Sequence, residues 1–180
     1  MESVKLNKIM CGAVLAMGFI SAAQANQGSG TVNFTGAIID APCSIKPESL
    51  DQTVELGQIA NAALSAGSNT GASVPRAFDI KLENCAFTGD KTVEVTFKGP
   101  QSQFDTDSLA LLGNTSSASI VLTDISNNKV VLQKPTAAQK LTTGNNTLRF
   151  YAYVQASGGD TSAIVPGAFQ SAAQFELNYL

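Results

Sequence analysis

Residues 31–39 read Thr-Val-Asn-Phe-Thr-Gly-Ala-Ile-Ile, and the chain ends with Phe-Glu-Leu-Asn-Tyr-Leu at residues 175–180. In both stretches apolar and polar side chains alternate, as in a β-strand with one buried face. The first stretch follows a polar leader, residues 26–30, made of Asn, Gln, Gly and Ser. A strand behind such a leader need not be buried in its own domain, because it can be buried in a neighbouring molecule. Which of the two holds decides what the chain does.

The first 25 residues have the features of a signal peptide. Lys5 and Lys8 form a positive n-region, residues 9–20 form an apolar run, and Ala-Gln-Ala at residues 23–25 fits a small-x-small cleavage site. The apolar run is too short for a membrane span. We therefore expect residues 1–25 to be removed on export.

Export decides how the three cysteines are interpreted. Cys11 falls within the predicted signal peptide, and the residues before it do not resemble a lipobox, which disfavours a lipid anchor. The mature chain then keeps Cys43 and Cys85, which predict one structural disulfide in an oxidising compartment. Such a bridge should stabilise the fold by about 4 kcal/mol on the chain-entropy model. A cysteine-based metal site would need more ligands, and the sequence has no histidine.

Short alternating runs separated by turn signals fill the rest of the chain. The clearest are Val93–Lys98 and Leu148–Val154, and weaker ones lie at residues 54–56, 78–82, 120–122, 130–132 and 173–179. Turn signals such as Gly99-Pro100 and Pro166-Gly167 lie between the runs. No stretch shows a sustained 3.6-residue period, and we expect residues 60–72 to form a loop with one helical turn at residues 60–64. The pattern predicts an all-β sandwich or barrel.

Composition and charge argue against several classes of function. Loss of residues 1–25 removes two lysines and one glutamate, which changes the formal net charge from −3 to −4. With no basic block, nucleic-acid binding is disfavoured. Without histidine, Ser/His and Cys/His nucleophiles cannot form, and Asp105-Thr-Asp107 is typical of a solvated turn. We therefore expect no enzyme activity, no catalytic or metal site and no cofactor.

Five features of the chain occur together. They are the segments Gly30–Cys43, Asp51–Gly57 and Phe78–Cys85, the residue Gly167, fourteenth from the end, and the penultimate residue Tyr179. Jointly they resemble the chaperone–usher pilins of type 1 and P pili, and a rod-type subunit more than a tip adhesin. The resemblance extends over the whole mature chain.

The resemblance implies an incomplete immunoglobulin-like β-sandwich in residues 40–180, which is completed by a donor strand from a neighbouring subunit. Residues 26–39 are implied to be the extension that supplies this strand, with an inserted face formed by Val32, Phe34, Gly36 and Ile38. A periplasmic chaperone and an outer-membrane usher are implied as assembly partners. The strand that borders the groove and is read by the chaperone is implied to contain Gly167, Phe175, Leu177, Tyr179 and Leu180.

We therefore expect a structural subunit of a bacterial surface fimbria that is exported through the periplasm, polymerises by donor-strand exchange and supports cell adhesion. Its expected partners are identical or related pilins and, through the assembled fibre, host-surface ligands. Two alternatives remain. One is a minor or adaptor pilin of the same fibre, and the other is a monomeric exported carbohydrate-binding sandwich that would use Tyr151 and Tyr153. By pattern alone, residues 31–39 could also be the first strand of a closed sandwich.

Overall fold

The computed structural model describes residues 30–113, 117–158 and 164–180. The contacts within the chain divide it into two units, Met1–Ile38 and Ile39–Leu180. In the first unit, residues 30–38 form neither strand nor helix. The predicted signal peptide lies outside the described residues.

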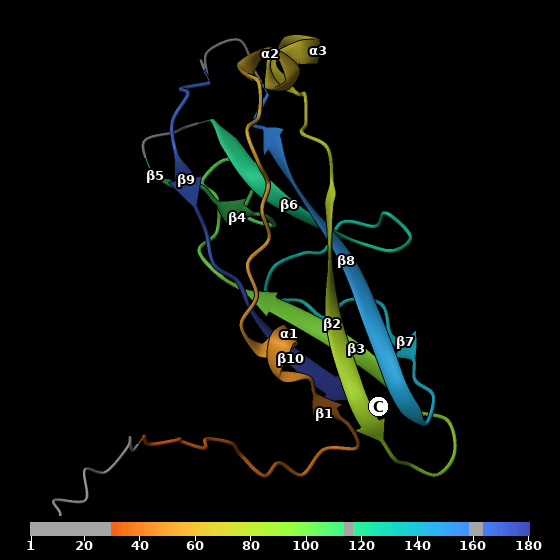
Figure 1. Cartoon of the computed structure of the whole chain (residues 1–180). Coiled ribbons are helices and arrows are strands. Elements are labelled where there is room, and N and C mark those ends of the chain that lie inside the picture. The colour runs from red at the N-terminus through yellow and green to blue at the C-terminus, as the bar shows by residue number, and fades with distance from the viewer. Residues whose placement is uncertain (1–29, 114–116, 159–163) are drawn as a thin grey trace, which may run out of the picture. The chain divides into compact units, whose positions relative to one another are not determined.

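Short strands dominate the second unit (Figure 1). The strands of its described residues are β1 (Ser44–Ile45), β2 (Arg76–Cys85), β3 (Thr92–Lys98), β4 (Leu109–Ala110), β5 (Leu112–Gly113), β6 (Ala118–Asp124), β7 (Gln139–Lys140), β8 (Gly144–Ala156), β9 (Phe169–Gln170) and β10 (Gln174–Tyr179). The helices are single turns, α1 (Pro47–Leu50), α2 (Asn61–Leu64) and α3 (Ala66–Asn69). The predicted helical turn at residues 60–64 corresponds to α2.

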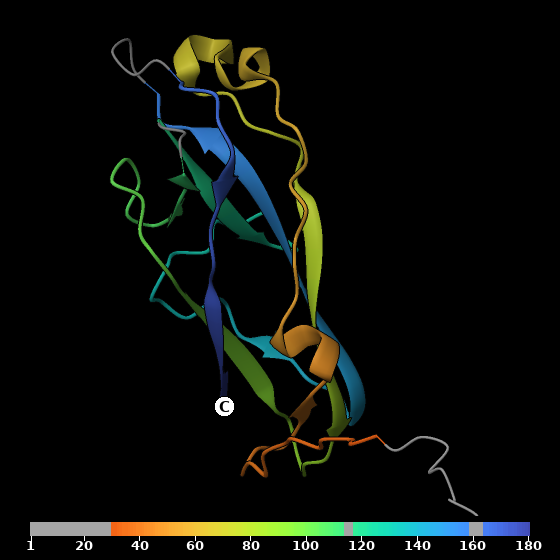
Figure 2. The same ribbon diagram turned by 60° about the vertical axis from the view of Figure 1, so that its left-hand side comes forward.

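Two antiparallel sheets pack against each other, as Figure 2 shows. The larger has the strand order β1-β2-β8-β6-β4 and the smaller the order β10-β3-β7, while β5 and β9 form a separate pair. Rings from both sheets meet between them. The Phe97 ring of β3 lies 5.0 Å from that of Phe150 in β8 and 6.1 Å from that of Phe78 in β2. The predicted all-β sandwich is confirmed.

Alternation along the strands explains this packing. In β3, Val93, Val95 and Phe97 are buried, whereas the residues between them are only half-buried. In β8, the even-numbered residues from Leu148 to Ala156 are buried, and the odd-numbered ones are half-buried or exposed. Each strand therefore gives one apolar face to the interior, as the period of two predicts.

Two of the predicted runs are not strands. Val54 and Leu56 are half-buried, but they lie in an extended segment without a ladder partner. Residues 130–132 form a buried loop, in which the Val130 N–H donates to the Leu122 carbonyl at 2.8 Å. Here the strand prediction was wrong. The chain then turns, with the Lys134 N–H donating to the Val131 carbonyl at 3.2 Å, and β3 has only an isolated bridge beyond this turn, between Thr96 and Pro135.

A β-bulge near the end of β2 places Cys85 in the core. The register against β8 shifts between Leu82 and Cys85, so that three residues of β2 span two of β8. Without the additional residue, the alternation that buries Leu82 would bury Asn84 instead of Cys85. Asn84 adopts the left-handed conformation with φ 54°, which Asn tolerates better than most residues. Cys85 thereby reaches Cys43, and the predicted disulfide is present.

Replacing Asn84 with Ala should lower the free energy of unfolding by about 1 kcal/mol, because alanine is disfavoured in the left-handed region. Asn84→Gly should change it little, since glycine adopts this conformation freely. Guanidinium unfolding with the disulfide intact measures the free energy of unfolding of both variants. Glu83→Ala is the control, because it makes the same kind of change at a neighbouring residue outside the left-handed region. An Ala variant as stable as the Gly variant would show that the bulge conformation is not what Asn84 supplies.

Candidate functional site

An open apolar groove of about 1190 Å³ lies between two segments that are distant in sequence, residues 45–61 and 164–176. Figures 1 and 2 show these segments running in opposite directions along the sandwich. The groove is larger than a typical small-molecule pocket. Its floor consists of core side chains from both sheets, namely Phe78, Phe97, Ile120, Leu122, Ala152 and Val154. The groove therefore opens onto the interior of the sandwich.

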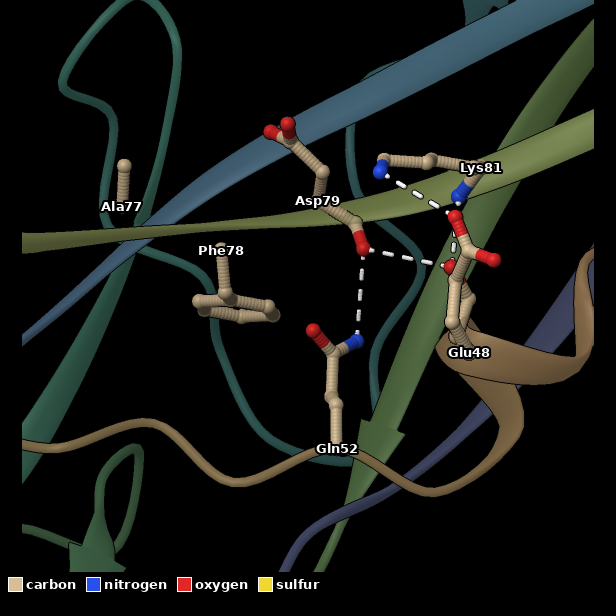
Figure 3. A pocket seen from close by; sticks show the side chains of 7 residues that line it. Glu48, Gln52, Ala77, Phe78, Asp79 and Lys81 are labelled. Carbon is tan, nitrogen blue, oxygen red and sulfur yellow. Dashed lines mark hydrogen bonds and ion pairs between the residues drawn. The ribbon is translucent and has the colours of Figure 1, made fainter.

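The first wall of the groove is joined to β2 only at its beginning. Ser49, which is 2% exposed, accepts a hydrogen bond from the Lys81 N–H at 3.0 Å and donates one to the Asp79 carbonyl at 3.4 Å. Gln52 also donates to the Asp79 carbonyl (Figure 3). Residues 53–59, all of them described, then make no main-chain hydrogen bond to another segment. Residues 53–59 of this wall are therefore an extended segment that pairs with no strand of the described residues.

The second wall, β10, has one free edge. Leu180 and Thr92 exchange two main-chain hydrogen bonds, at 2.9 and 3.2 Å. Because hydrogen-bonded and non-hydrogen-bonded pairs alternate in an antiparallel ladder, every second residue of β10 then turns its N–H and C=O away from β3. These residues are Phe175, Leu177 and Tyr179. Within the described residues no strand pairs with that side of β10, so its edge is open to another chain.

The predicted C-terminal residues divide into two groups. Gly167 and Phe175 line the groove. Leu177 and Tyr179 pack against the core beyond the groove lining, where desolvation raises the pKa of the Tyr179 hydroxyl. Leu180 closes the ladder with β3, and its side chain is exposed. A role of this strand in chaperone recognition stays a prediction.

The predicted donor residues belong to the first unit and are exposed there. Phe34 exposes 91% of its surface, and Val32 and Ile38 are also exposed. A Cβ added at Gly36 would meet nothing within 4 Å. Three large apolar side chains in seven residues are therefore exposed, and their donor role stays a prediction.

A second, smaller pocket of about 240 Å³ lies where the first wall meets β2 (Figure 3). Its charged groups are paired: Lys81 Nζ lies 3.2 Å from Glu48 Oε1, and Arg149 binds both carboxylate oxygens of Asp79 at 2.8 and 3.0 Å. The hydrogen bond from Arg149 holds the pKa of Asp79 below its usual value. This pocket therefore joins the wall to the sheet and leaves no charged group free for a ligand.

The described residues hold little else that could carry chemistry. Asp105 accepts hydrogen bonds from Ser108 and from the Asp107 N–H, and pairs with Lys129 at 2.7 Å. In the described part of the chain, no group of three or more His, Cys, Asp or Glu side chains could hold a metal ion. Among the same residues, none of the helices has the length and apolar character needed to cross a bilayer.

Comparison with known proteins agrees with this geometry. The family model described as "Fimbrial protein" matches residues 32–180. The chain is 54% identical over 177 residues to the Fimbria A protein of Serratia marcescens. This alignment covers 98% of this chain and 99% of that protein. It is 45% identical over 179 residues to the Major MR/P fimbria protein of Proteus mirabilis, with coverage of 98% and 99%.

A solved chaperone–usher pilus structure, which concerns rod uncoiling, contains a chain with a TM-score of 0.77 and 34% identity to this one. The likeness covers 88% of this chain and 100% of that chain. The predicted incomplete immunoglobulin-like sandwich is confirmed. The chain belongs to the fimbrial protein family and is a structural subunit of a chaperone–usher pilus.

Proposed function

We propose that this subunit polymerises by accepting residues 26–39 of a second copy in its groove and by giving its own residues 26–39 to the next copy. The observation that carries this proposal is the groove itself. It opens onto core side chains between the extended segment 53–59 and β10, and among the described residues neither of these segments has a strand partner on its groove side. An inserted strand would complete the core and both edges at once.

The extension has the chemistry that the groove requires. Val32, Phe34 and Ile38 share one face of an extended strand, and burying each contributes about 1.5–3 kcal/mol. Its main chain can also bond to the free N–H and C=O groups along β10, each bond adding about 1 kcal/mol net. Gly36 interrupts the apolar face, as expected where the groove floor approaches the strand closely.

A neighbour's extension fits the groove better than the subunit's own. Ile38 lies five residues before Cys43, a reach of about 17 Å, and the disulfide fixes Cys43 to the end of β2. A chain folding back from Cys43 would have to run in the same direction as β10. A neighbour's strand can run antiparallel to β10, which is the slightly more stable pairing.

The groove also needs cover before assembly, because an open apolar edge favours aggregation. A periplasmic chaperone would lend a strand along β10 first, and an outer-membrane usher would then exchange it for the next extension. The fibre would stand on the cell surface and support adhesion. The likeness to a major fimbria protein favours a rod-forming subunit over a minor or adaptor pilin.

Deleting residues 26–38 while keeping the signal peptide should give a subunit that accepts a donor strand but cannot supply one. A peptide copying Thr31–Asp40 should bind this subunit and raise its thermal midpoint. At a peptide concentration a hundred times the dissociation constant, the gain is about 2.7 kcal/mol. A peptide with Val32→Asn and Phe34→Asn should give no gain.

The deletion distinguishes the two roles considered for residues 31–39, which are a donor strand for a neighbour and the first strand of a closed sandwich. If these residues were the first strand of a closed sandwich, their removal would leave no soluble folded subunit. A deleted subunit that stays folded and monomeric but ignores the peptide at high concentration would argue against the groove as an acceptor.

A further inference from the structure

The charged residues of the groove lining are all acidic. Asp51 and Glu55 belong to the first wall and Glu176 to the second, and the described lining residues include neither Lys nor Arg. None of the ion pairs in the described part of the chain involves Asp51 or Glu55. Glu176 is partly neutralised, because Lys98 Nζ lies 2.6 Å from its carboxylate.

Two of these carboxylates lie on the outer face of the sandwich, on opposite sides of the groove. Val54 and Leu56 are half-buried while Glu55 between them is exposed. In β10, Phe175 and Leu177 are half-buried, and Glu176 between them is exposed. A strand inserted along the groove would therefore pass Glu55 on one side and Glu176 on the other, and both carboxylates would lie on the side of its outer face.

The donor segment is free of charge. Residues 26–39 contain no Asp, Glu, Lys or Arg, and the first acidic residue is Asp40. With Val32, Phe34 and Ile38 turned to the core, Asn33, Thr35 and Ala37 form the outer face, because side chains alternate along a strand. The residues placed between the two walls are thus neutral.

We propose that the outer face of the donor strand selects the partner by its charge. The carboxylates of Glu55 and Glu176 admit a strand that is neutral or cationic at positions 33 and 35 and disfavour one with a carboxylate there. The occupant is a second copy of this chain, whose uncharged extension meets the requirement. This inference rests on the proposed function. It adds a preference for uncharged or cationic donor strands, which the apolar contacts of the donor strand alone do not supply.

Cross-strand electrostatics set the size of the effect. Like charges facing each other across neighbouring strands are unfavourable, by an amount that corresponds to about a twofold to fivefold change in affinity for each pair. Lys98 shields Glu176, so Glu55 should contribute more. The screening length is about 10 Å at 0.1 M salt and about 3 Å at 1 M, so high salt should remove most of the discrimination.

The test uses the full mature chain, held monomeric at low concentration, and fluorescent peptides copying residues 26–39. Peptides with Thr35→Glu, Thr35→Lys and Thr35→Gln, and the same series at Asn33, are compared by their association rates and dissociation constants. The Gln peptides are the uncharged controls of matched length. Relative to them, we expect Glu peptides to bind about twofold to fivefold more weakly and Lys peptides correspondingly more tightly at low salt.

The acceptor variant Glu55→Lys should reverse the order of the Glu and Lys peptides, and Glu55→Gln should reduce the difference between them. Equal binding of the Glu, Gln and Lys peptides to the unaltered chain would overturn charge selection, while the proposed groove would still stand on the binding itself. A preference that is unchanged in Glu55→Lys would also overturn it. If no peptide binds, the groove assignment fails together with this inference.

Discussion

A subunit carrying Phe34→Asp should fold and still accept a donor strand, but it should not extend a fibre. Phe34 is the largest apolar residue of the extension and is 91% exposed in the first unit. In the proposed assembly its replacement buries an unpaired carboxylate, which costs several kcal/mol, and loses about 1.5–3 kcal/mol of apolar burial. Since about 1.4 kcal/mol is a tenfold change, donation should weaken by more than a thousandfold. Electron microscopy of cells and gel ladders of unheated fibres would measure the loss.

Two variants serve as matched controls for Phe34→Asp. Asn33→Asp places the same charge one residue away on the outer face, where only a reduction of a few fold is expected. Phe34→Leu keeps an apolar group on the inserted face and should still form fibres. If Phe34→Asp formed fibres as long and as stable as those of the unaltered chain, Phe34 would not belong to the inserted face of the donor strand.

Removing the disulfide should lower stability nearly as strongly. Cys43 and Cys85 are separated by 42 residues, and opening a loop of this length costs about 4 kcal/mol on the chain-entropy model. This is a large part of the 5–15 kcal/mol that typically stabilises a domain. The double variant Cys43→Ala with Cys85→Ala should therefore unfold at much lower guanidinium concentration, and fewer subunits should survive export.

The unaltered protein, compared with and without reductant, is the control for the cysteine variant. Reduction should lower the unfolding midpoint about as far as the double substitution does. Both cysteines should resist thiol labelling in denatured, unreduced protein. Two reactive thiols in that sample, or a double variant with an unchanged midpoint, would contradict the structural role of the bridge.

Local alternation was enough to predict the central strands, because one face of each is buried within this chain. The predicted strand at residues 93–98 corresponds to β3, and the one at residues 148–154 lies within the longer strand β8. The same alternation also contains a signal of the bulge. Cys85 is out of phase with Ile80 and Leu82, so a continuous strand could not have buried all three.

Other features depend on partners that local sequence does not contain. Residues 54–56 alternate like a strand, yet no strand in the described part of the chain pairs with them, so their place in a groove wall could not be predicted. The apolar residues 130–132 resemble a buried strand by periodicity, which cannot distinguish a strand from a buried loop. Glu55 and Glu176 are distant in sequence, and only the fold brings both to the lining of one groove.

The bridge between Cys43 and Cys85 also determines how a fibre assembled in this way would respond to pulling. Tension would reach each subunit from its extension at Ile39 and would pass through Cys43 within a few residues. From there the covalent bond leads it directly to the end of β2, which is paired with β8 along most of its length. The two-residue strand β1 and the single turn α1 lie outside this path. In the proposed assembly, pulling would therefore load the broad sheet at this end and bypass β1 and α1, and the tension would leave the subunit through β10 and the neighbour's strand in the groove.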